Sequence, residues 1–109
     1  MSRSREAAAA PLFAALGDEN RLRIVTRLAT QGRGNLTALL AAAPVTRQAI
    51  SQHLGVLEAV GLVRSEKVGR ERLWELEPKR LADAHAYLDR VSTQWDDAIA
   101  RLRAFVEDA

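Results

Sequence analysis

Cysteine is absent from this chain of 109 residues, which excludes disulfide bonds, thiolate metal sites and cysteine nucleophiles. No run of about 18 apolar residues occurs, so the sequence offers no candidate for a membrane-spanning helix. A glycine-rich phosphate loop is also missing, and the few aromatic residues sit on apolar stripes, which argues against single-stranded RNA recognition. We therefore expect a soluble, cytoplasmic protein with no membrane partner.

The residues that are present are those of an ordinary globular protein, with 48% hydrophobic and 28% charged side chains. The length fits one domain over residues 1–109, and a domain of this size gains apolar burial by forming oligomers. Residues 1–45 carry six basic and three acidic side chains, whereas residues 77–109 carry five basic and seven acidic ones. This asymmetry permits binding to a polyanion through one face.

Helical periodicity and capping residues predict four helices in the first half of the chain. Gly17 ends the first helix, Thr46 has the chemistry of an N-cap, and Gly61 ends the fourth helix. Pro44 is expected to stop the third helix, because proline cannot continue a helix without losing a hydrogen bond. The expected helices cover residues 7–16, 19–30, 37–43 and 46–60.

A β-hairpin and one long helix are expected to follow. Residues 62–68 and 71–77 are rich in strand-forming side chains and flank a turn at Gly69-Arg70, which predicts a hairpin packed beside a helix pair, that is, a wing. Pro78 suits the first position of the last helix. The expected architecture is mainly α with a β-hairpin wing, in the order α-α-α-α-β-β-α, with the helix-turn-helix and wing in 35–77.

The last helix carries the strongest periodic signal of the chain. Its apolar residues alternate steps of four and three over more than three heptads, which favours a partner helix and hence a homodimer. The alternative is that this seam packs only on the first and second helices of its own chain. For a dimer, the interface helices would be 1–17 and 78–107, with these candidate contact residues: Leu12, Phe13, Leu88, Val91, Trp95, Leu102 and Phe105.

Polar side chains gather on one side of the fourth helix, opposite its apolar positions. Arg47, Gln48, Ser51 and Gln52 follow the cap at Thr46, and all four can hydrogen-bond to base edges in a DNA major groove. An ordinary solvated helix face is the alternative interpretation.

The hairpin favours the DNA interpretation, because Lys67, Arg70 and Arg72 lie within six residues and suit phosphate contacts. Glu66 and Glu71 partly offset this charge, so a merely solvated hairpin is the alternative.

Several motifs together resemble the ArsR/SmtB-type transcriptional repressors. They are Ala15-Leu16-Gly17-Asp18, Arg21-Leu22-Arg23-Ile24, Ser51-Gln52-His53-Leu54 and Gly61-Leu62-Val63, and the resemblance covers nearly the whole chain. It implies a homodimeric winged-helix repressor that binds an inverted-repeat operator in double-stranded DNA. In that family, the positions of Arg47, Gln48, Ser51 and Gln52 face the major groove, and the first and last helices form the dimer interface.

The chain departs from the metal-sensing members of that family. Those members commonly carry a cysteine motif in the third helix, which is absent here. A second family metal site, on the last helix, would correspond to Asp83, His85, Asp96 and Ile99. The first three side chains can bind a metal ion and Ile99 cannot. The site would therefore lack one ligand unless Asp97 or water takes the place of Ile99. We expect no cofactor and a solvated helix face here, with a metal-responsive repressor as the alternative. The sequence identifies no small-molecule effector.

Two other function classes are weaker. Catalysis would rest on Ser51 near His53, but side chains two residues apart on a helix point in different directions. A winged-helix protein-interaction module without DNA binding would fit acidic replacements at Arg47, Lys67, Arg70 and Arg72, and these residues are basic. Duplex DNA is therefore the expected partner.

Overall fold

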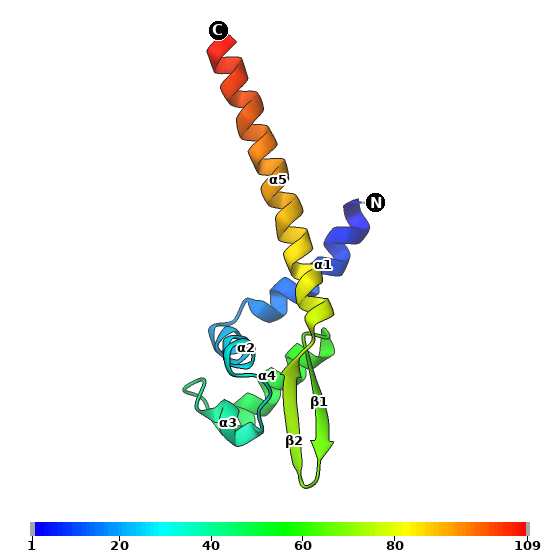
Figure 1. The fold of residues 1–109 in the computed structure, drawn as a ribbon, viewed down its shortest axis with the longest axis vertical. Helices are drawn as coiled ribbons and strands as arrows, with labels where there is room; N and C mark the ends of the chain where they lie inside the picture. The colour runs from blue at the N-terminus through cyan, green and yellow to red at the C-terminus, as the bar shows by residue number, and fades with distance from the viewer. Residues whose placement is uncertain (1, 109) are drawn as a thin grey trace.

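The structure, a computed structural model, describes residues 2–108 and contains five helices and one hairpin in that range (Figure 1). The elements are α1 (Ser2–Leu16), α2 (Glu19–Gln31), α3 (Leu36–Leu40), α4 (Arg47–Ala59), β1 (Val63–Val68), β2 (Glu71–Leu76) and α5 (Pro78–Asp108). This confirms the predicted order of elements. Among the described residues, no helix combines the length and the apolar character needed to cross a membrane.

Capping side chains set the start of the helices α2, α3 and α4. The side chains of Asp18, Asn35 and Thr46 each accept a hydrogen bond from the backbone N–H three residues later, at the N-termini of α2, α3 and α4 respectively. Each bond satisfies a donor that the first turn of a helix leaves without an internal partner. The predicted cap at Thr46 is confirmed.

The predicted bounds of the third helix were wrong, because α3 covers only Leu36–Leu40 instead of 37–43. The N–H of Ala42 bonds the carbonyl of Leu39, so the chain tightens into a turn well before Pro44. Proline also disfavours helical geometry in the residue before it, which keeps Ala43 out of the helix. The turn therefore ends the helix three residues earlier than predicted.

The first helix also differs from its prediction, since α1 begins at Ser2 and carries Pro11 inside it. Pro11 has no backbone N–H, so the carbonyl of Ala7, four residues earlier, loses its helical hydrogen bond. Both residues are exposed, and water can bond to this carbonyl.

The hairpin is antiparallel and pairs Val63 with Leu76 and Val68 with Glu71. Gly69 has a φ of 63°, a left-handed conformation that glycine adopts without steric cost at the tip. A short bridge joins β2 to the loop before α3, where Gly34 and Trp74 exchange two backbone hydrogen bonds of 3.0 and 2.9 Å. The wing is therefore attached to the helical part of the domain and does not stand free.

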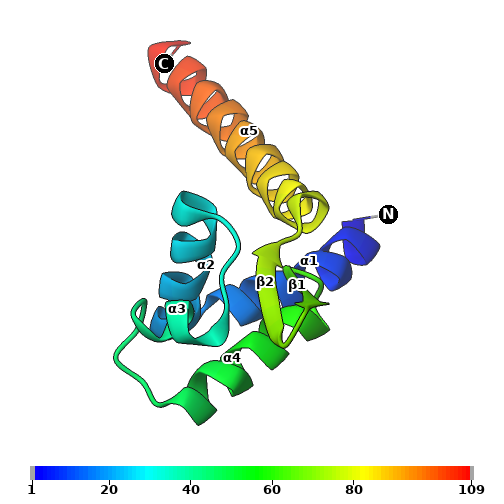
Figure 2. The ribbon, with the colours of Figure 1, turned by 60° about the horizontal axis from the view of Figure 1, so that its bottom comes forward.

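The core lies between the four short helices and the start of β1, whose arrangement Figure 2 shows. Its fully buried large side chains are Leu12, Ile24, Leu39, Ile50, Leu54, Leu57 and Leu62. Leu12 was predicted at a dimer seam, but only 1% of it is exposed, so it fills the core of its own chain. Helix α1 turns its most apolar face inward, which the sequence pattern alone did not reveal.

Helix α5 has 31 residues, which corresponds to a length of about 46 Å, and it projects away from the rest of the molecule (Figure 1). Its first turns lie against α1, where the rings of Phe13 and Tyr87 are 5.7 Å apart. Ala84 is its only fully buried residue. The remainder of the helix makes the molecule 68 Å long but only 29 by 20 Å across.

Candidate nucleic-acid interface

Helix α4 has a buried face and a polar face, as its sequence predicted. Ile50, Leu54 and Leu57 are completely buried and attach the helix to the core. On the other side, four side chains are exposed at its N-terminal end: Arg47, Gln48, Ser51 and Gln52. Thr46 is exposed as well, and its hydroxyl accepts a hydrogen bond of 3.1 Å from the N–H of Ala49. The core thus holds the polar face in a fixed orientation toward solvent.

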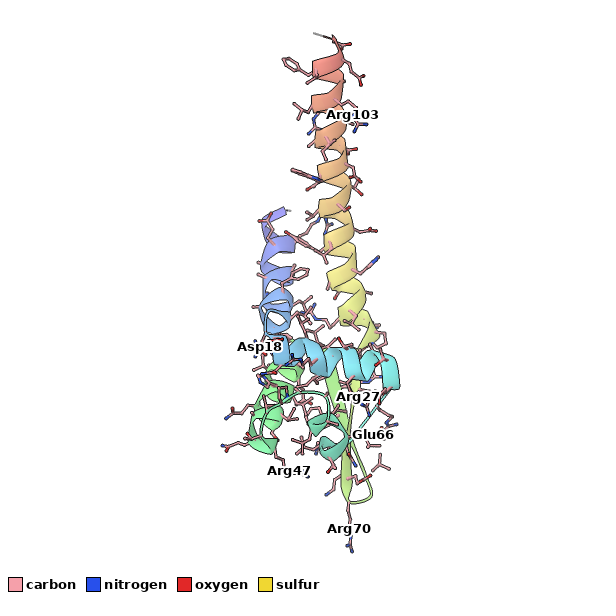
Figure 3. All side chains as sticks on the ribbon, turned by 90° about the vertical axis from the view of Figure 1, so that its left-hand side faces the viewer. Asp18, Arg27, Arg47, Glu66, Arg70 and Arg103 are labelled. Atoms are coloured by element: carbon pink, nitrogen blue, oxygen red, sulfur yellow. The ribbon has the colours of Figure 1, made fainter. Side chains whose placement is uncertain are left out.

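The wing and the start of α4 lie side by side along one groove of about 340 Å³. Its lining residues are Asn35, Leu36, Thr37, Arg47, Ser51, Arg70, Glu71, Arg72 and Trp74. Figure 3 shows Arg70 at the tip of the hairpin and Arg47 toward the same end of the molecule, with Arg103 near the opposite end. The groove therefore combines predicted base-reading and phosphate-binding residues on one side of the molecule.

Two polar residues of this groove, Asn35 and Thr37, were not among the predicted DNA contacts. Asn35 caps α3 and donates a hydrogen bond of 2.9 Å to Glu71 of the wing, while Thr37 accepts one of 3.5 Å from Arg47. The cap signal at Asn35 was visible in the sequence, but its long-range partner was not. Both residues bring the start of α3 to the interface.

The acidic residues of the wing have partners outside the predicted set of DNA contacts. Glu66 pairs with Arg33 at 3.3 Å, and Glu71 accepts the bond from Asn35. Within residues 5–108, no carboxylate forms an ion pair with Arg47, Lys67, Arg70 or Arg72. Their positive charges consequently remain available to a polyanion.

Arg72 is held by a short chain of hydrogen bonds. It donates to Ser65 Oγ at 2.8 Å, and Ser65 donates to Glu58 of α4 at 3.3 Å. On the other face of the wing, Arg64 lies 3.0 Å from Glu75 and 2.6 Å from Glu77. The hydrogen bond that Arg64 donates to Glu75 and the charge of Glu77 raise the pKa of Arg64, so this cation stays charged and paired.

A second cluster supports α4 from behind. The guanidinium of Arg21 bonds the carbonyls of Ala14 and Ala15 at the end of α1 and lies 3.4 Å from Nδ1 of His53. The backbone N–H of Arg21 donates to Asp18 and is the main reason why the pKa of that carboxyl lies below its usual value. His53 is half-buried in this junction of α1, α2 and α4.

The residues considered for a metal site do not come together in this chain. Asp83 accepts a bond of 3.1 Å from Arg80. Asp96 lies farther along the same helix, at a distance of about 20 Å for 13 residues. His85 is exposed, and within the described residues no three potential ligands cluster.

The predicted dimer contacts on α5 are all exposed in the single chain. The exposed fraction is 55% for Leu88, 67% for Trp95 and 74% for Phe105, and Val91 and Leu102 are exposed as well. Phe13 is half-buried against Tyr87. An apolar stripe therefore runs along α5 without a partner from its own chain.

Comparison with known proteins places this architecture in a family. Residues 16–66 match the model of a helix-turn-helix domain. The chain is 41% identical to the HTH-type transcriptional regulator Rv2034 of Mycobacterium tuberculosis over 80 residues, which is 73% of this chain and 74% of the regulator. It is also 39% identical over 92 residues to the HTH-type transcriptional repressor SmtB of the same species, with 84% of this chain and 66% of the repressor covered.

A solved structure extends the likeness to the complete fold. An ArsR-like transcriptional regulator from Rhodococcus sp. RHA1 superposes with a TM-score of 0.85 at 37% sequence identity, covering 100% of this chain and 99% of the other. This overlap includes the wing and the long last helix. The chain therefore belongs to the ArsR/SmtB family of winged helix-turn-helix transcriptional regulators.

Proposed function

We propose that the chain binds double-stranded operator DNA as a homodimer and represses transcription. The observation that carries the proposal is the groove in which Arg47 and Ser51 of α4 lie together with Arg70 and Arg72 of the wing. The name of the mycobacterial relative, a repressor, supports the direction of regulation.

Helix α4 is the proposed reading element. Arg47 can pair with O6 and N7 of guanine, and Gln48 and Gln52 can pair with N6 and N7 of adenine in the major groove. Ser51 can bond to either kind of base pair. The exposed N-terminal end of α4 is the part that a recognition helix inserts into the groove.

The wing is the proposed phosphate clamp. Lys67, Arg70 and Arg72 would contact the backbone beside the groove that α4 occupies, which supplies affinity without sequence preference. Thr46 and Thr37, at the starts of α4 and α3, can add hydroxyl contacts to phosphate oxygens.

The homodimer would pair the apolar stripes of two α5 helices, with α1 packed alongside. This arrangement removes the exposed side chains of Leu88, Trp95 and Phe105 from water. Two α4 helices would then enter successive major grooves of an inverted repeat, roughly 10 bp apart, and exclude polymerase from the promoter. The chain would act in the cytoplasm, without catalysis and without a resident metal.

The test is fluorescence anisotropy of the purified protein with DNA from its own upstream region and with random duplex, titrated across salt in the presence of a metal chelator. We expect a preference for the upstream DNA under chelator. No binding under any condition would contradict the proposal and favour a protein-interaction role. A preference that appears only after zinc or nickel is added would instead assign a metal-responsive repressor.

A further inference from the structure

A second groove, of about 310 Å³, lies between α1 and the first turns of α5, on the opposite side of the core from the DNA-facing end. Its charged lining consists of Arg5, Arg80, Asp83 and Arg90, and its apolar lining consists of Ala8, Ala9, Leu12, Ala86 and the ring of Tyr87. Basic side chains outnumber acidic ones in a part of the molecule where α5 is otherwise rich in acid.

The basic groups of this groove are not all neutralised. Asp83 pairs with Arg80 at 3.1 Å, while within residues 5–108 no carboxylate forms an ion pair with Arg5 or Arg90. Arg90 lies over the ring of Tyr87, with its guanidinium carbon 5.7 Å from the ring centre. The groove thus offers guanidinium donors for an anion next to a flat apolar surface for the body that carries it.

Arg80 connects this groove to the end of the recognition helix. Its Nε donates a hydrogen bond of 3.0 Å to the carbonyl of Val60, the C-cap of α4. Gly61, with a φ of 79°, packs so closely that a Cβ there would lie 3.2 Å from Cγ of Arg80. Any ligand that redirects the guanidinium of Arg80 therefore changes the support of the turn between α4 and the wing.

We propose that this groove binds a small organic carboxylate with a flat apolar body, and that such a ligand weakens DNA binding through Arg80. The volume lies at the small end of the range for ligand pockets, which suits a molecule of the size of an aromatic acid. The second half of the proposal rests on the proposed DNA-binding function, whereas the first half does not.

The groove stays accessible when the apolar stripe of α5 is covered. Asp83, Ala86 and Arg90 recur at helical spacing, and so do Leu88 and Trp95, but the two sets lie roughly 160° apart around the helix. Pairing of two stripes therefore does not require the groove to close.

Isothermal titration calorimetry with benzoate tests the site without DNA, and benzamide serves as the neutral isostere. We expect millimolar or tighter benzoate binding, about tenfold weaker binding of benzamide, and about tenfold weaker benzoate binding after Arg90→Gln. Arg101→Gln, on the exposed part of the same helix, is the matched control and should bind benzoate like the unaltered chain. Equal binding of benzamide, an unaltered Kd in Arg90→Gln, or no benzoate binding would overturn the site.

Anisotropy with operator DNA tests the coupling. Benzoate should weaken operator binding by the unaltered protein at least threefold, and Arg80→Lys, which keeps the charge but loses the Nε donor to Val60, should reduce this effect to less than half. Calorimetric binding of benzoate without any change in DNA affinity would refute the coupling. Failure to bind DNA at all would refute the proposed function and leave the calorimetric result as the measure of the site.

Discussion

The two ends of this molecule differ in how completely their own chain buries apolar surface. At the end formed by α4 and the wing, Ile50, Leu54 and Leu57 are fully buried beneath a polar surface. Along the outer part of α5, large apolar side chains such as Trp95 and Phe105 are mostly exposed instead. The first region therefore buries its apolar side chains within one chain, whereas the second leaves an exposed apolar stripe of the kind that marks interaction sites.

Trp95→Glu has the largest expected effect and tests whether the apolar stripe of α5 is covered by a partner. A charge in the α5 stripe should prevent dimer formation, and loss of bivalent contact should lower operator affinity by about 10²–10⁴-fold. Light scattering gives the oligomeric state, circular dichroism the folding and anisotropy the affinity. Gln94→Glu, exposed at the neighbouring position, is the charge control. A folded dimer of Trp95→Glu would place the interface elsewhere.

Ile50→Ala tests whether the buried face of α4 anchors this helix to the core of its own chain. Removal of this fully buried side chain should lower the free energy of unfolding by about 2–5 kcal/mol, measured by urea denaturation. Val56→Ala, on the exposed side of the same helix, should cost much less. Similar losses for the two variants would mean that α4 is not anchored through the face that the structure buries.

The reading role of α4 is sharpened by Gln48→Ala. Loss of a paired contact to a base should reduce discrimination between operator and random DNA by about 1–3 kcal/mol, while affinity for random duplex changes little. Anisotropy with both duplexes measures this difference. An equal loss of affinity for both DNAs would indicate that Gln48 contacts the DNA backbone, and it would reject the base-reading assignment.

The role of the wing predicts the opposite pattern for Arg72→Ala. Binding to operator and random DNA should weaken alike, and the slope of log K against log salt should fall in magnitude by about one. Glu75→Ala, on the same strand, gives the effect of altering the wing without removing a proposed phosphate contact. A change confined to operator DNA would contradict the assignment.

The smallest expected effect concerns pH and the cap of α2. Because the native pKa of Asp18 lies below its unfolded value of about 3.9, its stabilising contribution is present above that value and is lost as pH falls through the native pKa. Asp18→Asn keeps a capping oxygen but does not titrate, so its Tm should fall less between pH 5 and pH 2 than that of the unaltered chain. Parallel Tm curves would exclude Asp18 as a source of acid sensitivity.

Local signals explain which parts of the fold were predictable from sequence. The cap at Thr46, the turn at Gly69 and the spacing of apolar residues in α5 act within a few residues of their effect, so they could be recognised in the chain. The short α3 was missed because a backbone turn ended it before Pro44 did. Leu12 was misplaced because apolar periodicity does not distinguish a core contact from a dimer contact.

The site itself was predictable in its residue types but not in its pairings. The exposed face of α4 follows from helical spacing, since the residues opposite Ile50 must point away from the core. The partners of Glu66 and Glu71, however, come from the loop before α3, more than 30 positions away in sequence. No periodicity encodes such contacts, so the charge available on the wing was underestimated.

The two backbone hydrogen bonds between Gly34 and Trp74 join the hairpin to the loop that precedes α3. Together with the Arg33–Glu66 and Asn35–Glu71 contacts, they make the wing and the helix-turn-helix one preorganised unit. Such a unit loses little conformational entropy when it meets DNA. Regulation of binding would then act on the spacing and relative rotation of two such units across the dimer, and much less on the folding of the wing.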